Sequence, residues 1–200
     1  MTISALNTDF YELTMMQGYF LCGNNPQVVF DMFYRTNPFN GGYVVFTGLN
    51  DLIGKLENLA FSGEDIDYLR SLGRFDERFL QYLASFRFSG TIHAMDEGSF
   101  VFPGEPLIRV ESNLMEAQLI EGLLLNTINF QSLIATKACR MSLACGGGQI
   151  MEFGLRRAQG PDGALSATRA AYIGGASATS NTLAGKMYGI PVAGTMAHSW

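Results

Sequence analysis

Apolar residues near the start of the chain recur at helical spacing. Thr8 or Asp9 stands just before them as a candidate N-cap, and Glu12 follows three or four residues later, which is a helix-start pattern. The spacing therefore predicts a helix whose apolar positions are Phe10, Leu13, Met16, Tyr19 and Phe20.

Strand-like and helix-like patterns then alternate up to residue 111. Residues 28–35 and 43–49 are dense in β-branched and aromatic types, which predicts two strands joined by a turn. Residues 50–87 indicate helices in pieces, with Ser62 and Asp76 as caps. Glycine and proline then separate three short strands, which is typical of a small β-rich lobe, at 88–95, 98–102 and 106–111.

A long helical pattern runs from Met115 to about Leu143. It is apolar on more than one side, so it predicts a largely buried helix or helix pair. The glycine run at 145–148 ends it. We expect the domain boundary there, with an N-terminal α/β domain at 1–145 and a second domain beginning at 146–200.

The pattern changes after this boundary. Strands are expected at 149–155 and 171–175, and residues 189–200 are expected to hold a third strand and the start of its loop. Helices are expected between the strands, at about 163–171 and 179–188. Strand, helix, strand, helix, strand is the sequence pattern of a parallel α/β fold, in which ligands bind at the carboxyl ends of the strands. Polar residues follow each strand and are expected to converge on one face, among them Arg156, Ser180 and His198.

Composition excludes some classes of protein. The net charge of −5 argues against a protein that coats nucleic acid, although it does not exclude a local positive pocket. No signal peptide or membrane span is visible, so no membrane partner is expected and a cytoplasmic protein is the default. Three cysteines without C-x-x-C spacing predict buried free thiols in a reducing compartment.

Two sites carry candidate chemistry. Arg156 and Arg157 stand at a predicted strand end beside a Gly-Pro-Asp-Gly loop, where strand alternation would turn only one of them toward a ligand. Guanidinium groups suit phosphate or carboxylate, whereas two solvated surface arginines are the ordinary alternative. His198 lies just past a strand and is equally compatible with a base, phosphate binder or phosphoryl acceptor and with no chemical role. His93 is interpreted as structural.

Several segments, in this order, resemble the nicotinate phosphoribosyltransferase family. They are TDFYELTMMQGYF, VVFDMFYR, GGYVVFTGL, EFGLRRAQGPDG, AAYIGGASATSN and GIPVAGTMAHSW. The whole chain is similar to the N-terminal portion of that enzyme, which implies an N-terminal α/β domain followed by the first strands of an incomplete type II phosphoribosyltransferase α/β barrel. It also implies a homodimer with shared active sites.

The resemblance implies a reaction. Nicotinate and phosphoribosyl pyrophosphate give nicotinate mononucleotide and pyrophosphate, with Mg²⁺ and coupled ATP hydrolysis, in NAD salvage. Tyr11 of the neighbouring subunit and Phe153 would sandwich the pyridine ring, and Arg156 would bind the anionic substrates, with Arg157 beside it. Two more residues, Gly194 and Ser199, would line the nicotinate pocket. His198 would accept phosphate from ATP and become phosphohistidine.

Two alternatives stay open at this point. The chain could be a non-catalytic fragment or a dimerisation module of the same fold. It could also belong to a sibling phosphoribosyltransferase for nicotinamide or quinolinate, although the RRAQGPDG run favours nicotinate. The sequence stops soon after its third predicted strand in this region, so we expect the intact protein to continue beyond Trp200 and this chain alone to be incomplete.

Overall fold

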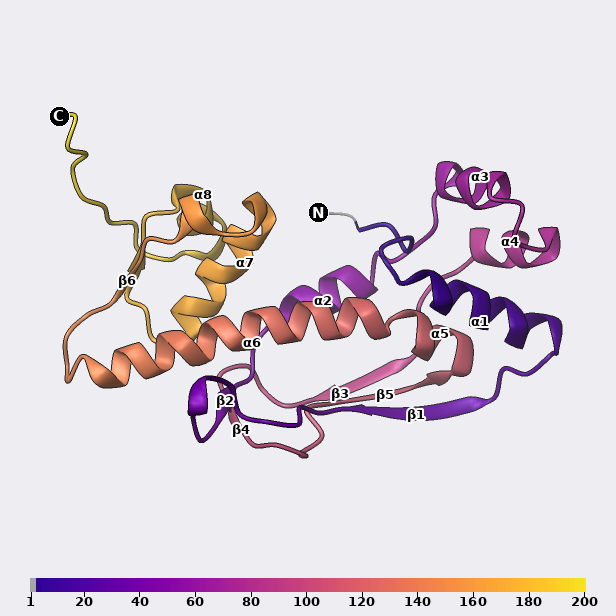
Figure 1. The fold of residues 1–200 in the computed structure, drawn as a ribbon, viewed down its shortest axis with the longest axis horizontal. Coiled ribbons are helices and arrows are strands. Elements are labelled where there is room, and N and C mark those ends of the chain that lie inside the picture. Colours follow the sequence, from indigo (N-terminus) through magenta and orange to yellow (C-terminus); the bar gives the residue numbers. More distant parts are fainter. Residues whose placement is uncertain (1–2) are drawn as a thin grey trace. The chain divides into compact units, whose positions relative to one another are not determined.

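The computed structural model describes residues 3–200, and they form two compact units. The first unit consists of the described residues up to Met32 together with Leu49–Ala94 and Pro106–Thr127. The second consists of Phe33–Gly48, Met95–Glu105 and Ile128–Trp200. The expected α/β class is confirmed, and both units combine helices with strands (Figure 1). The division after residue 145 stays a prediction for the complete protein.

An antiparallel sheet of three strands organises the first unit. Its order is β1-β5-β3, with Phe30 and Ile92 both opposite Val110, and its strands are β1 (Gln27–Met32), β3 (Thr91–Ala94) and β5 (Ile108–Asn113). Burial alternates along β5, so one face of that strand is packed and the other is open. The strands predicted here are confirmed, although β1 and β3 are shorter than predicted and β5 begins and ends two residues later. The helices of this unit are α1 (Phe10–Leu21), α2 (Leu49–Leu56), α3 (Gly63–Ser71), α4 (Glu77–Ala84) and α5 (Leu114–Leu119).

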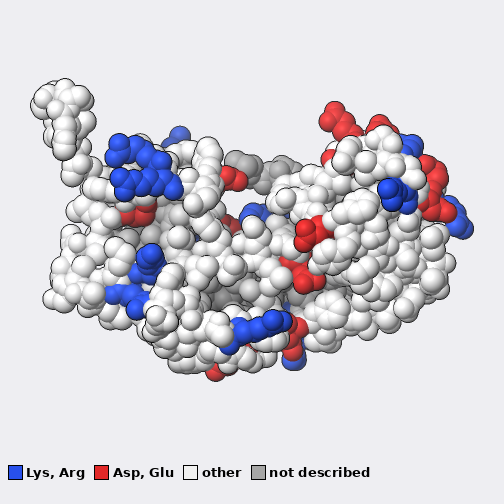
Figure 2. Space-filling view, viewed as in Figure 1, with Lys and Arg blue, Asp and Glu red and all other residues white. Residues whose placement is uncertain are grey.

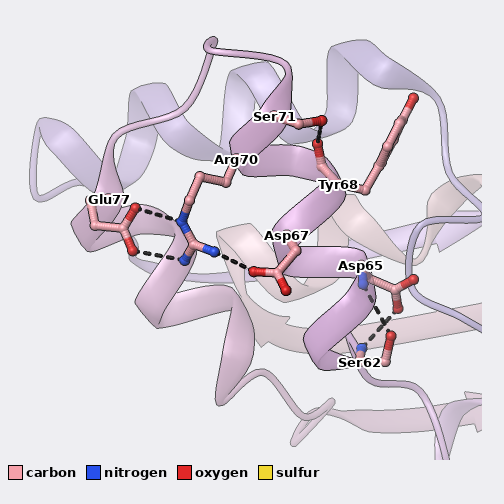
Figure 3. A network of polar contacts seen from close by, with 7 residues as sticks. All are labelled: Ser62, Asp65, Asp67, Tyr68, Arg70, Ser71 and Glu77. Atoms are coloured by element: carbon pink, nitrogen blue, oxygen red, sulfur yellow. Dashed lines mark hydrogen bonds and ion pairs between the residues drawn. The ribbon is translucent and has the colours of Figure 1, made fainter.

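Local capping explains where two of these helices begin. Ser62 accepts a hydrogen bond from the Asp65 amide, and the Asp65 side chain accepts one from the Ser62 amide, which closes a capping box on α3 (Figure 3). Asp76 accepts from the Arg78 amide and caps α4, so both predicted caps are confirmed. Asp9 occupies the N-cap position of α1, but its side chain makes no capping hydrogen bond within the described residues.

The long helical pattern forms a helix pair. After α5 comes α6 (Glu121–Ala144), whose residues up to Thr127 belong to the first unit and whose residues from Ile128 belong to the second. Gly146 and Gly147 follow it with φ of 56° and 95°, a backbone region that suits glycine, so the predicted break is confirmed. Within residues 3–200, α6 included, no helix combines the length and the apolar character that crossing a membrane needs.

Buried hydroxyls and an ion pair hold the first part of the second unit. β2 (Val44–Val45) pairs antiparallel with β4 (Phe100–Val101), near the short 3₁₀ helix η1 (Pro38–Asn40). The Val45 amide donates to Thr136 Oγ1 over 2.9 Å. Arg169 and Glu97, each with 17 % of its side chain exposed, form a two-pronged ion pair.

The remainder of the second unit is a parallel α/β segment. β6 (Met151–Glu152) leads through the 3₁₀ helix η2 (Leu155–Arg157) into α7 (Gly160–Ile173), then β7 (Ala178–Thr179) and α8 (Thr182–Tyr188). β6 pairs parallel with β7, and Thr179 forms a parallel bridge to Val192. The predicted alternation and parallel direction are therefore confirmed for β6 and β7, whereas the third predicted strand is reduced to the single parallel bridge at Val192.

Two local predictions in this segment are wrong. The Gly-Pro-Asp-Gly run is no loop but the first turn of α7, because proline fits the first positions of a helix. The strand expected at 171–175 is the last turn of α7 and the bend after it. Gly175, with φ of 107°, ends that bend, and the strand follows at Ala178.

The cysteines depart from expectation in one respect. All three are free thiols, as predicted. Cys139 is partly buried, but Cys22 and Cys145 are exposed, so the expectation of burial is wrong for those two. Both exposed residues lie at helix ends, Cys22 as the C-cap of α1 and Cys145 directly after α6, where side chains leave the packed face.

Candidate functional site

The arginine pair lies in a short turn that follows β6. Arg156 and Arg157 are exposed and belong to η2, which the Arg157 amide closes by donating to the Gly154 carbonyl over 2.9 Å. Successive residues of a 3₁₀ helix are about 120° apart, so the expected strand alternation does not apply to them. Figure 2 shows Lys and Arg side chains gathered on the second unit close to the C-terminal segment. The turn therefore presents guanidinium groups to solvent beside the carboxyl end of a parallel strand.

Phe153 stands between β6 and this turn, with 43 % of its surface exposed. Large apolar side chains are exposed at a cost unless a partner or ligand covers them, and an open aromatic face next to two arginines suits a flat anionic ligand. Phe153 and Arg156 thus lie within one short segment of the second unit.

Glu152 holds the start of this segment. Its Oε2 accepts hydrogen bonds from Thr168 Oγ1 over 2.8 Å and from Thr179 Oγ1 over 2.7 Å, and its Oε1 accepts one from the Gly154 amide. The sequence pattern places Thr179 among the polar residues that follow the predicted strands, but it singles out neither Glu152 nor Thr168. The one available signal is a carboxylate inside a short, otherwise apolar strand, since such a group needs partners when it is partly buried.

A cavity of about 300 Å³ opens beside the turn within the second unit. Helix α6, strand β6 and helix α7 line it with mainly apolar side chains, including Ile134, Ala138, Met141 and Ala167. Its polar lining includes Lys137, Glu152 and Arg157. A mostly apolar hollow with a few charged groups at one side has the chemistry of a small-molecule site.

The predicted residues near the end of the chain follow the third parallel segment. The Ala193 amide donates to the Thr179 carbonyl over 2.9 Å, so Gly194 comes directly after a segment that runs parallel to β7. His198 and Ser199 occupy a turn that the Trp200 amide closes on the Ala197 carbonyl, at 3.1 Å, and both are exposed. Parallel strands place their carboxyl ends at the same sheet edge, so these residues follow the edge that Phe153 and Arg156 follow.

Tyr11 belongs to the first unit, on the first turn of α1, and 49 % of it is exposed. The Tyr11 hydroxyl interacts with the side chain of the neighbouring Glu12. This contact and the negative charge of Glu12 raise the pKa of Tyr11 to about 12. Glu12 itself is 1 % exposed, and neither of its carboxylate oxygens has a hydrogen bond of standard geometry among the described residues. Tyr11 is therefore a neutral phenol beside a buried carboxylate.

Neither the remaining histidine nor a metal cluster adds a second centre. His93 lies on β3, largely exposed, with Nε2 3.9 Å from a Glu111 carboxylate oxygen, and its structural role stays a prediction. Within residues 3–200, no group of three or more His, Cys, Asp and Glu side chains is arranged to hold a metal ion. The expected Mg²⁺ stays a prediction for the complete protein.

Known proteins resemble this chain along nearly its whole length. A nicotinate phosphoribosyltransferase of Caenorhabditis elegans is 49 % identical over 99 % of this chain and 36 % of its own length. One of Bacillus subtilis is 46 % identical over 98 % of this chain and 40 % of its own length. A crystal structure of human nicotinic acid phosphoribosyltransferase superposes with a TM-score of 0.90 at 41 % identity, covering 96 % of this chain and 39 % of that one.

The extent of these matches and a match to a family model together identify the family of this chain. The chain spans well under half the length of the relatives it matches. Residues 6–129 match the model described as the nicotinate phosphoribosyltransferase N-terminal domain. The chain therefore belongs to the nicotinate phosphoribosyltransferase family.

Proposed function

We propose that this chain is part of an enzyme that forms nicotinate mononucleotide and pyrophosphate from nicotinate and phosphoribosyl pyrophosphate, in NAD salvage. The observation that carries the proposal is the shared sheet edge: Phe153 and Arg156 follow one parallel strand, and Gly194 and His198 follow another. Family membership supplies the substrate class, because the relatives are named for nicotinate. The complete fold would be the incomplete type II phosphoribosyltransferase barrel, in a cytoplasmic protein.

The aromatic residues would bind the pyridine ring. Phe153 offers an exposed ring beside the arginine turn, and Tyr11 would cover the other ring face from the partner subunit of a homodimer. Offset stacking on both faces suits an electron-poor ring. A neutral Tyr11, which its raised pKa favours, also avoids a negative charge next to the nicotinate carboxylate.

The arginines would bind negative charge. Arg156 is exposed and its fork of donors matches carboxylate or phosphate oxygens, while Arg157 also lines the neighbouring cavity. Glycosyl transfer is expected to pass through an oxocarbenium-like transition state, which needs positioning and charge stabilisation more than a strong nucleophile. The turn after β6 would thus hold both substrates in a reactive arrangement.

His198 would link the transfer to ATP. It lies exposed in a turn, with Gly194 and Ser199 nearby in sequence as parts of the nicotinate pocket. A neutral imidazole nitrogen is a suitable nucleophile for the γ-phosphorus of ATP; the N–P bond forms, ADP leaves, and the imidazole proton passes to solvent. Phosphohistidine would then place negative charge beside the arginine turn.

The substrate assignment is tested with a protein that carries this chain and the remaining length of its relatives. Nicotinate, nicotinamide and quinolinate are compared as acceptors of the phosphoribosyl group. We expect kcat/KM for nicotinate to exceed that for nicotinamide by at least about 100-fold, because an arginine-lined site favours the carboxylate. A preference for either other pyridine would assign the chain to a sibling reaction, and no turnover with any would favour a non-catalytic module.

The role of His198 has its own test. Incubation with γ-labelled ATP should label one histidine with an acid-labile, base-stable phosphoryl group, which peptide mapping locates. His198→Asn should abolish both the label and the stimulation by ATP, while slow transfer without ATP remains. His93→Asn is the matched control and should keep the label. Label that persists in His198→Asn, or that maps to His93, would contradict the assignment.

A further inference from the structure

Glu152 joins three segments of the second unit through its carboxylate. One hydroxyl partner, Thr168, comes from α7 and the other, Thr179, from β7, while the third donor is the amide of Gly154. The two threonines are 1 % and 0 % exposed. Buried hydroxyls require hydrogen-bond partners, and a carboxylate acceptor is charge-assisted, so these contacts are stronger than neutral ones.

The contacts continue beyond the carboxylate. Thr179 Oγ1 donates to Glu152 and accepts from the Asn181 amide over 3.0 Å, and the Asn181 side chain in turn caps α8. Thr168 Oγ1 also lies 2.9 Å from the Ala164 carbonyl in the preceding turn of α7. The carboxylate therefore connects the end of β6 to α7, which precedes β7, and indirectly to α8, which follows β7.

Together, these hydrogen bonds of the Glu152 carboxylate form a clamp, and Phe153 lies between its two ends. Glu152 precedes it, and Gly154, whose amide the same carboxylate holds, follows it. A Cβ at position 154 would lie 2.9 Å from Glu152 Oε1, so a larger residue there would displace the carboxylate. Gly154 also provides the carbonyl that closes η2 through the Arg157 amide. The backbone on both sides of Phe153 is thus fixed by one side chain.

Proton transfer is not the role that this environment supports. A carboxylate has about four lone-pair positions, and three donors already occupy positions on Glu152. Its partners lie in the protein itself and come from different segments. Such a group is built to hold backbone and side chains in place.

We infer that Glu152 is a positioning residue, whose carboxylate fixes the Phe153–Arg157 turn so that the aromatic ring and the Arg156 guanidinium keep the orientation that ligand binding requires. That this orientation serves ligand binding rests on the proposed function. The clamp itself does not depend on it. Loss of the clamp should weaken substrate binding by letting the turn move.

The test uses four variants of the protein that carries the complete length of the family: Glu152→Ala, Glu152→Gln, Thr168→Val and Ser166→Ala. Hydrogen–deuterium exchange of peptides covering residues 153–159 reports on the clamp without any ligand. Nicotinate KM and kcat report on its consequence. Ser166→Ala is the matched control, because Ser166 lies on α7, is partly exposed and donates only to the Asp162 carbonyl among the bonds described.

Glu152→Ala should speed exchange in this peptide at least about tenfold and raise the nicotinate KM by at least about tenfold, with a smaller effect on kcat. Glu152→Gln keeps one acceptor oxygen and gains an NH₂ group that can donate hydrogen bonds to the threonine hydroxyl oxygens. It should therefore recover most of the protection from exchange. Thr168→Val, which removes one of the three contacts, should fall between them. Ser166→Ala should match the wild type.

Unchanged exchange at residues 153–159 in a folded Glu152→Ala protein would overturn the inference, as would Glu152→Gln behaving like Glu152→Ala. If Glu152→Ala does not fold, the comparison of Thr168→Val with Ser166→Ala decides, and equal exchange rates would overturn it. A wild-type protein that does not use nicotinate would refute the proposed function alone, because the exchange measurement still tests the clamp.

Discussion

Two stretches pair an aromatic residue with a glutamate, and their glutamates differ sharply. Glu12 follows Tyr11 on α1, is 1 % exposed, and lacks a hydrogen bond of standard geometry within the described residues. Glu152 precedes Phe153, is only partly buried, and accepts hydrogen bonds from three donors. The more buried carboxylate is therefore the less satisfied one.

The difference follows from the secondary structure around each residue. Glu152 ends a two-residue strand, where the next amides are not used by the sheet, so the Gly154 amide is available to it. Glu12 stands three residues after the Asp9 N-cap, where a capping box would satisfy its carboxylate, but α1 has no side-chain cap of that kind. It lies instead close to Glu121, and partial burial and then the charge of Glu12 raise the pKa of that carboxyl.

Burial alone therefore does not make a carboxylate a fixed structural element. Three donors make Glu152 part of a rigid segment, as a positioning role requires. Partial burial and the charge of Glu12 raise the pKa of the Glu121 carboxyl, so the repulsion at this place depends on the titration of Glu121. We therefore expect the Phe153 side of the proposed site to be rigid and the Tyr11 side to respond to its electrostatic environment.

The largest expected effect concerns the rigid side. Arg156→Ala in the complete protein should lower kcat/KM by at least about 100-fold, the size expected for the loss of a charge-assisted contact worth ~3 kcal/mol. Its melting temperature should be unchanged, because Arg156 is exposed. Arg74→Ala, which removes an exposed arginine of the first unit, is the control and should keep wild-type kinetics. Near-wild-type kinetics for Arg156→Ala would break the link between the turn and the ligand.

A smaller change in activity is expected when the Tyr11 side and the Arg156 side of the proposed site are tested together in one dimer. Tyr11→Ala and Arg156→Ala proteins, each inactive alone, should regain activity when their subunits exchange, because a hybrid dimer has one site with both residues intact. Random exchange makes half of the dimers hybrid, so about a quarter of wild-type activity is expected for an interface related by two-fold symmetry. Self-mixed samples of each variant serve as controls. No recovery after verified exchange would place Tyr11 outside a shared site.

The smallest effect concerns Glu12 and the pH dependence of stability. Partial burial, then the charge of Glu12 and that of Asp9, raise the pKa of the Glu121 carboxyl. A folded-state pKa above the unfolded value means that the folded protein binds the proton more tightly. This contribution to stability is present below the ordinary glutamate range and is lost as the pH rises through the raised pKa.

Glu12→Gln should therefore reduce the fall in melting temperature between pH 4 and pH 7, by only about 1 °C, since solvent screens Glu121. Burial remains in the variant, so the fall should shrink and not disappear. Glu64→Gln, at an exposed position on α3, is the matched control and should leave the pH profile unchanged. A profile for Glu12→Gln that coincides with the wild type would remove the contrast between the two glutamates.

Local signals determined much of the fold. Ser62 and Asp76 start helices through contacts with amides two or three residues away, and the glycines after Ala144 end one, so neighbouring residues contain all that is needed. The alternating order of strands and helices after residue 148 was likewise predictable, because each element carries its own pattern. The candidate binding residues Tyr11, Phe153, Gly194 and Ser199 came from motif resemblance alone, which does not depend on packing. Arg156 and His198 were also indicated by their places after predicted strands.

Tertiary structure decided what local pattern could not. Tyr172 and Ile173 favour strands by composition but continue α7, where the neighbouring Ala170 and Ala171 are buried, so packing overrides propensity. The role of Glu152 needed the fold even more, since its partners lie 16 and 27 residues along the chain, at Thr168 and Thr179. Sequence specifies which residues have hydrogen-bonding groups, whereas only the packed chain brings a distant donor within 3 Å of a particular oxygen.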